Sequence, residues 1–195
     1  MKQFLFAVVF LSLSSLAIGA DIDTSASMIS WKGTKLVGGG HDGTVKLKSG
    51  KVDFDRSGNL TGGEFEIDLN SIVNIDVKDP SYNKKLVDHL KSPDFFDVAK
   101  YPTAKFKIKS AKLDPKAKTW TIIGDLTIKG KTNQETIVAT VADSGKAKIA
   151  TSKIEIDRMK YDVKYNSAKI IDVKKLKDKV INDKIALDLN IKTKG

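Results

Sequence analysis

The feature that most constrains the fold of this chain is a regular alternation of apolar and polar residues. In residues 104–109, alanine, phenylalanine and isoleucine alternate with three lysines, and in residues 64–69 three acidic residues alternate with phenylalanine, isoleucine and leucine. The same period of two recurs at 120–128 and 185–191. Because successive side chains of a strand point to opposite faces, this pattern predicts strands with one face buried and one in water. It favours an antiparallel sheet.

Further strand-like stretches lie at 27–37, 43–54, 136–142 and 147–157, which makes eight or nine strands in one domain. Residues typical of turns separate them, and we expect turns at Ser49-Gly50, Ser57-Gly58-Asn59, Asp114-Pro115, Lys129-Gly130 and Asp143-Ser144-Gly145. A sandwich and a closed barrel both fit this spacing. Closure removes exposed strand edges, and an eight-stranded barrel has room for packed side chains or one small ligand.

One segment breaks the alternation with a helical pattern. In Ser81–Lys91, Leu86 and Leu90 are four residues apart and form an apolar stripe with Val87. Prolines at 80 and 93 suit the start and the end of a helix. The predicted fold is therefore all-β, an antiparallel β-barrel of about eight strands with a short amphipathic helix inserted near residues 80–91.

The first twenty residues are predicted to be a signal peptide. Lys2 precedes an apolar run at 4–13, and small residues follow at Ala17, Gly19 and Ala20. The run is shorter than the roughly 20 residues that span a bilayer. We expect cleavage after Ala20 or Gly19, a mature domain at 21–195 and export, most simply to a bacterial periplasm. A retained N-terminal anchor helix is the alternative.

Composition excludes some classes of function. The chain has no cysteine, so it has no disulfide, no thiolate nucleophile and no cysteine-ligated metal. Lysine and arginine exceed acidic residues by 34 to 24, a net charge of +10. Only Arg56 and Arg158 are arginines, and arginine is the residue that reads phosphate and guanine bidentately. We therefore expect lysine-rich outer strand faces and no nucleic-acid partner, and leave open a transient contact with an anionic membrane surface.

Two motifs match known ligand sites in spacing but not in context. Gly38, Gly40 and Gly43 satisfy the dinucleotide fingerprint, but a strand follows them instead of a helix, so we interpret them as a bend. Residues Asp53–Glu64 match the spacing of a twelve-residue calcium loop. Strands flank that loop where an EF-hand has helices, so a hairpin is favoured and calcium binding is the alternative.

Candidate catalytic groups are few. The two histidines, His41 and His89, belong to no recognised catalytic or metal motif. Aromatic residues are more informative, because an apolar interior with few polar groups fits a pocket for a long apolar molecule. The large candidates are Trp31, Phe65, Phe95, Phe96, Phe106 and Trp120.

The order of short motifs resembles the YceI-like, polyisoprenoid-binding family of bacterial periplasmic proteins. The resemblance covers about the whole of the mature chain. It rests on Trp31–Gly33 with Lys35, His41–Gly43, Gly62–Asp68, Ser71-Ile72, Leu86–Ser92, Asp94–Val98, Tyr101–Ala104, Gly124–Gly130, Asp157-Arg158, Tyr161–Val163, Tyr165–Ser167 and Ile181–Asp183.

This resemblance implies a lipocalin-like barrel that holds an isoprenoid quinone, a polyprenyl phosphate or another long-chain lipid, with no cofactor and no established catalytic residue. It implies that His41, His89, Asp68 and Arg158 orient a headgroup or brace the mouth, and that a lid is formed by Leu86, Leu90, Phe95 and Phe96. The implied tunnel is lined by Trp31, Phe65, Ile67, Phe106, Trp120, Ile122, Leu126 and Ile128.

Two other functions remain open from the sequence. One is an enzyme that acts on such a lipid with His41 or His89 and Asp68, and the other is a structural or stress-protective factor. The oligomeric state, including a homodimer, is also left open.

Overall fold

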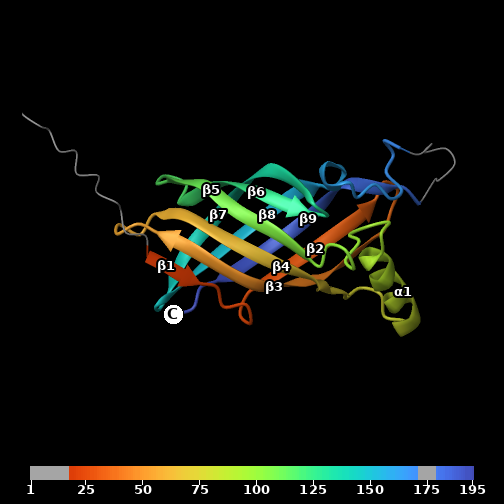
Figure 1. Ribbon diagram of the computed structural model, residues 1–195, viewed down its shortest axis with the longest axis horizontal. Coiled ribbons are helices and arrows are strands. Elements are labelled where there is room, and N and C mark those ends of the chain that lie inside the picture. The colour runs from red at the N-terminus through yellow and green to blue at the C-terminus, as the bar shows by residue number, and fades with distance from the viewer. Residues whose placement is uncertain (1–17, 171–178) are drawn as a thin grey trace, which may run out of the picture.

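Eight antiparallel strands close into a barrel in the computed structural model, which describes residues 18–170 and 179–195 (Figure 1). The barrel runs in the order β3-β2-β9-β8-β7-β6-β5-β4, and pairing of β4 with β3 closes it. The strands are β2 (Met28–Lys35), β3 (Gly40–Phe54), β4 (Leu60–Asn74), β5 (Thr103–Asp114), β6 (Thr119–Ile128), β7 (Lys131–Ser144), β8 (Ala147–Asp157) and β9 (Ile181–Lys192).

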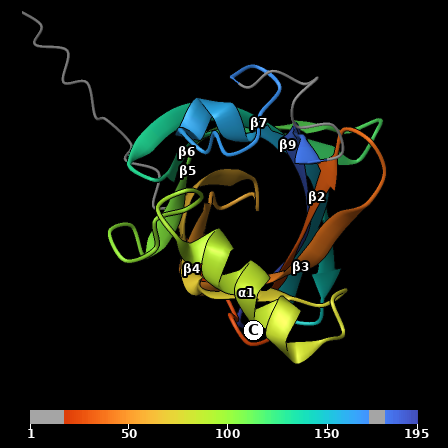
Figure 2. The same ribbon diagram turned by 90° about the vertical axis from the view of Figure 1, so that its right-hand side faces the viewer.

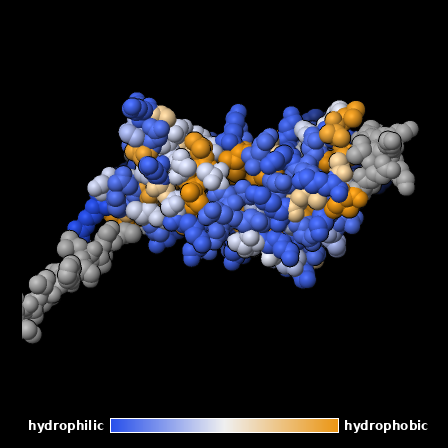
Figure 3. All heavy atoms as spheres, turned by 90° about the horizontal axis from the view of Figure 1, so that it is seen from above, coloured by the Kyte–Doolittle hydropathy of each residue, from blue (hydrophilic) through white to orange (hydrophobic). Residues whose placement is uncertain are grey.

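The predicted alternation is confirmed in the burial of the strands. On β5, Ala104, Phe106 and Ile108 are buried, and the lysines between them are exposed. Figure 3 shows the result on one side of the molecule, where the outer surface is largely hydrophilic. The inward faces of all eight strands supply the hydrophobic core, so the barrel prediction is confirmed over the sandwich.

The turn predicted at Ser49-Gly50 is wrong. These residues lie inside β3, where the pairing with β4 shifts register between Leu47 and Ser49. Such a bulge bends a long strand without ending it, and β3 continues to its hairpin at residues 55–59. The Ser49-Gly50 pair does mark an irregularity in the chain, but the residue types alone did not distinguish a bulge from a turn.

The helix α1 (Pro80–Lys91) forms as predicted. The carboxylate of Asp79 accepts hydrogen bonds from the backbone N–H groups of Ser81 and Tyr82, which caps the first turn. Asn83 donates to the carbonyl oxygens of Asn74 and Val77 and so holds the helix against the end of β4. Figure 2 shows α1 across one end of the barrel.

Two short elements were not predicted. The strand β1 (Ile18–Asp21) pairs with the far end of β3, and the 3₁₀ helix η1 (Arg158–Tyr161) follows β8. Residues 1–17 of the predicted signal peptide lie outside the described residues. Cleavage after Ala20 would remove most of β1, but Ile22, which is buried and donates its N–H to Gly50, would keep the chain on β3.

No helix in residues 18–170 and 179–195 is both long and apolar enough to cross a membrane.

The glycine-rich stretch at 38–43 starts in a bend at residues 36–38, but from Gly40 onward it belongs to β3, so the predicted bend covers only its first glycines. Its last glycine has a packing role, because Trp31 on β2 pairs with Gly43 and its ring lies against that backbone. A methyl group on Gly43 would lie 1.9 Å from the carbonyl oxygen of Val73 and 2.6 Å from the Trp31 ring. The indole Nε1 donates to the carbonyl of Thr44 at 3.3 Å, so the ring has little freedom to move.

We predict that Gly43→Ala lowers the free energy of unfolding by about 2 kcal/mol through overpacking. Denaturant unfolding monitored by tryptophan fluorescence measures the change. Gly33→Ala is the matched control, since an added methyl group there meets no atom within 4 Å. Equal stability of the two variants would contradict the packing role.

Candidate ligand-binding site

The barrel encloses a cavity of about 440 Å³. Side chains from all eight barrel strands line it, and most of them are aliphatic or aromatic. This volume lies within the range of roughly 300–1,000 Å³ that is usual for small-molecule pockets. The interior therefore contains a cavity and is not a completely packed core.

Twelve of the fifteen residues predicted to contact a ligand line this cavity, and their contact with a ligand stays a prediction. They are Trp31, Phe65, Ile67, Leu90, Phe95, Phe96, Phe106, Trp120, Ile122, Leu126, Ile128 and Arg158. The other three, His41, Leu86 and His89, do not line it.

The other side of the cavity wall was not predicted as part of the site. It comes from β7, β8 and β9 and includes Ile137, Ala139, Ile154, Leu187 and Leu189. These residues alternate as regularly as those that were selected. The alternation indicated strands there, but only barrel closure shows that their apolar faces point into the same space.

The α1 end of the cavity is closed by apolar side chains. Leu90 at the end of α1, Phe95 after it and Val163 after η1 are at most 9% exposed. His89 lies behind this lid, with its ring edge-on to Tyr165 at 4.5 Å and to Phe95 at 5.2 Å between centroids. His89 therefore supports the lid from outside the cavity.

Tyr161 is buried at the same end and directs its hydroxyl to Glu135 on β7. The hydroxyl donates to a Glu135 carboxylate oxygen at 2.8 Å, and Lys160 pairs with the same oxygen at 3.2 Å. Burial, with the adjacent carboxylate, raises the pKa of the Tyr161 phenol well above its ordinary value of 10.0. Tyr161 therefore acts as a neutral hydrogen-bond donor that ties η1 to the barrel wall.

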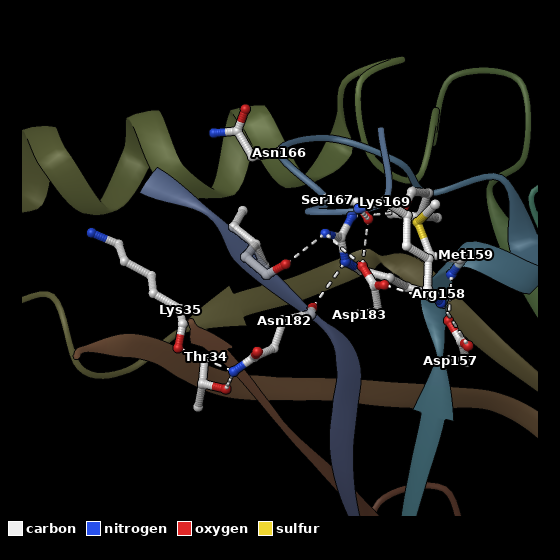
Figure 4. A network of polar contacts seen from close by, with 12 residues as sticks. Thr34, Lys35, Asp157, Arg158, Met159, Asn166, Ser167, Lys169, Asn182 and Asp183 are labelled. Carbon is white, nitrogen blue, oxygen red and sulfur yellow. Dashed lines mark hydrogen bonds and ion pairs between the residues drawn. The ribbon is translucent and has the colours of Figure 1, made fainter. Parts of the chain in front are cut away.

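Arg158 is also buried at this end, and its side chain is 1% exposed (Figure 4). Its guanidinium donates to three carbonyl oxygens: Nε to Asn182 at 3.0 Å, Nη1 to Val163 at 2.7 Å and Nη2 to Ile181 at 3.0 Å. Asp183 lies 3.5 Å from Nη2. Of the two roles left open for Arg158, the structure supports bracing, since its donors hold η1 and β9 together.

The side chains of Asn182 and Asp183 extend this network. Asn182 donates to the Thr34 hydroxyl and the Lys35 carbonyl on β2, while Asp183 accepts from Ser167 at 2.7 Å. Burial raises the pKa of the Asp183 carboxyl, but hydrogen bonds from Ser167 and Lys169, with the charges of Lys169 and Arg158, lower it overall. At the α1 end, these polar and charged side chains thus hold η1, β9 and β2 together.

The prediction that His41 or His89 acts together with Asp68 is wrong. His41 Nδ1 lies 2.9 Å from Asp76, and His89 Nε2 lies 3.3 Å from Asp94. Asp68 instead accepts a hydrogen bond from the backbone N–H of Asn70. The enzyme hypothesis therefore loses the pair of residues on which it was based.

The surroundings of Asp76 lower the pKa of its carboxyl group. Burial raises the pKa of its carboxyl, but hydrogen bonds from the Asp42 backbone, His41 and Asn74 outweigh this effect and lower the pKa to about 2. These bonds join the start of β3 to the segment between β4 and α1. Asp76 therefore stabilises the α1 end in its ionised form.

The calcium-like loop forms the β3–β4 hairpin. Asp55 accepts hydrogen bonds from the backbone N–H groups of Ser57 and Asn59, and Gly58 has a φ of +82° that suits its turn. Asp53 pairs with Lys51 at 3.5 Å. Within the part of the chain that the structure describes, no three His, Asp or Glu side chains gather as a metal site.

The end of the cavity opposite α1 has charged side chains that are exposed to solvent. It is bounded by the β3–β4 hairpin, the β7–β8 hairpin and the last residues of β9 (Figure 1). Lys148 and Asp143 line it and form an ion pair of 2.6 Å, with side chains 35% and 78% exposed. The cavity therefore has a closed apolar end and an end where charged groups meet water.

A family model described as "YceI-like domain" matches residues 21–193. The chain belongs to the YceI-like family. A UPF0312 protein of Pseudomonas putida strain W619 is 33% identical over 129 residues, which is 65% of this chain and 62% of the relative. The chain thus spans about 62% of the length of the relatives that it matches first.

Solved structures share the YceI-like fold. BcnA of Burkholderia cenocepacia superposes with a TM-score of 0.69 and 22% identity, covering 89% of this chain and all of BcnA. A polyisoprenoid-binding domain from Saccharophagus degradans, implicated in plant cell wall breakdown, has a TM-score of 0.63 and 14% identity, with coverage of 90% and 97%. The lipocalin-like barrel with one helix is therefore confirmed.

We predict that Arg158→Lys lowers the free energy of unfolding by about 3 kcal/mol, because lysine cannot reach three carbonyl groups in one plane. Arg56→Lys is the matched control, since Arg56, the only other arginine, is exposed in the β3–β4 hairpin. Urea unfolding of both variants measures the difference. Equal effects would show that Arg158 does not brace the lid.

Asp76 gives a prediction for acid stability. Its folded pKa of about 2 is below the ordinary 3.8, so it stabilises the fold above about pH 4, and this contribution is lost as pH falls toward 2. We expect the unfolding free energy of Asp76→Asn to fall by about 2 kcal/mol less than that of wild type over this interval. Unfolding in urea at several pH values measures this effect.

The control is Asp188→Asn, because the exposed carboxylate of Asp188 lies 3.6 Å from Lys153. This variant should keep the wild-type dependence. An Asp76→Asn variant with the wild-type acid response would refute the assignment.

Proposed function

We propose that this protein is exported and holds a long-chain amphiphile, such as an isoprenoid quinone or a polyprenyl phosphate, in its barrel cavity. The observation that carries the proposal is the apolar cavity of about 440 Å³. Burial of a lipid chain contributes about 0.8 kcal/mol per CH₂ group, so binding needs no catalytic group and no covalent bond.

Several findings support a lipid as the ligand. The YceI-like family membership of the chain and the polyisoprenoid-binding domain from Saccharophagus degradans, which shares its fold, are consistent with an isoprenoid. Every buried side-chain nitrogen and oxygen among the described residues has a hydrogen-bond partner. A cavity wall without unpaired buried polar groups suits a hydrocarbon chain, because such groups would lose their contacts with water.

Binding is favoured over catalysis. The histidines that the enzyme hypothesis needs lie outside the cavity lining and are paired with Asp76 and Asp94. The buried polar side chains that do line the cavity at its closed end, Arg158 and Tyr161, are engaged in holding the lid. We therefore propose a carrier or a store for the lipid.

Export is part of the proposal. The apolar run near the N-terminus supports it, and so does a family match that begins at residue 21, the residue that would follow cleavage. Collection of a lipid also requires brief contact with a membrane surface. The exposed side chains of Leu36, Val37 and Ile75 near the α1 end support such a contact.

Native mass spectrometry of the protein from the periplasmic fraction of its host tests export and binding together. We expect the mass of a chain that begins at Asp21, together with one lipid of defined mass that organic extraction removes. A mixture of lipids at low occupancy would favour the structural factor instead. An uncleaved chain without a ligand would contradict the proposal.

A pair of variants on β7 links binding to the cavity. Ala139 lines the cavity and is 4% exposed, whereas Ala142 is exposed on the outer face. Phenylalanine at 139 would displace a few methylene groups, so we expect Ala139→Phe to reduce lipid affinity about tenfold or more. Ala142→Phe is the control and should bind as wild type.

A further inference from the structure

The two ends of the cavity differ in what they can offer to a polar headgroup. At the α1 end the cation in the lining is Arg158, which is 1% exposed and donates to three carbonyl groups. Tyr161 is fully buried, and its hydroxyl donates a hydrogen bond to Glu135. A headgroup there would have to break bonds that hold the lid, and it would lose its contact with water.

The hairpin end offers a cation that is free to change partner. Lys148 is the first residue of the inward-facing row of β8, and its ammonium group lies 5.6 Å above the ring centre of Phe54, which also lines the cavity. Its ion-pair partner Asp143 is 78% exposed. An ion pair this exposed stabilises the fold only weakly, so little is lost when an incoming anion replaces Asp143.

The position of Lys148 is held by the backbone around it. Its N–H donates to the Thr193 hydroxyl at 2.8 Å, and its carbonyl accepts from the Thr193 N–H at 2.9 Å. Thr193 also lines the cavity. The start of β8 is thus attached to the end of β9, and the flexible part of Lys148 is its side chain.

We infer that the hairpin end is the headgroup subsite and that Lys148 selects amphiphiles with an anionic oxygen headgroup, a carboxylate or a phosphate. The inference rests on the proposed function, because it orients the bound lipid in that cavity. The chain points toward Phe95 and the closed end, and the head stays in water beside Lys148. Phe54 covers the first carbons of the chain below the ammonium group.

Three probes with the same sixteen-carbon chain test this inference: hexadecanoic acid, hexadecyl phosphate and the neutral hexadecanol. Affinities are measured by tryptophan fluorescence at pH 8 and low salt, with purified wild-type protein and variants. We expect wild type to bind either anion about tenfold more tightly than the alcohol, as expected for one charge-assisted contact. The two anionic probes decide whether a carboxylate or a phosphate is preferred.

Lys148→Gln should remove this preference and leave the affinity for hexadecanol unchanged. Lys153→Gln is the matched control, since Lys153 is on the same strand but 86% exposed on the outer face. It should keep the preference. Asp143→Asn should strengthen anion binding severalfold, because it removes the group that competes for the ammonium.

Binding of all three probes with equal affinity, or equal effects of Lys148→Gln and Lys153→Gln, would overturn the inference and leave the proposed function intact. Failure of wild type to bind any of the probes or any lipid from its host would overturn both.

Discussion

The hydrogen bonds between β3 and β4 close the sheet into a ring, and the rest of the structure depends on that closure. Once the ring is closed, the apolar faces of eight strands share one interior, and their lysine-rich faces form the outer surface. Small inward residues such as Ala104 and Ala139 leave that interior incompletely filled. The cavity follows from the closed circumference and the size of the side chains, and not from any special polar group.

Closure leaves a barrel with two ends, and different structures are found at each of them. At the α1 end, the helix, the aromatic residues after it and η1 form a lid that depends on Arg158 and on the ionised carboxyl of Asp76. At the hairpin end, Lys148 and Asp143 are partly exposed and form an ion pair with each other. A cavity with a closed apolar end and a charged open end suits a molecule that has the same asymmetry. This physical match connects the fold with the proposed lipid ligand.

The sequence predicted the lining residues better than it predicted polar roles. Alternation placed Phe65, Phe106 and Trp120 on inward faces because it follows directly from the geometry of a strand. The partners of His41 and His89 could not be found in this way, since Asp76 and Asp94 reach them through the loops around α1. Arg158 was selected by resemblance alone, and nothing local showed that it is buried against the carbonyl groups of β9.

What the sequence determined, then, is the eight barrel strands, the helix α1 and the apolar character of the inward faces, because these depend on interactions between residues close in the chain. The tertiary structure decided which carboxylate meets which histidine, which arginine donor meets which carbonyl, and which end of the cavity remains wet. It also showed Ser49-Gly50 to be a bulge instead of a turn. These features arise from contacts between distant segments, which exist only after the ring has closed.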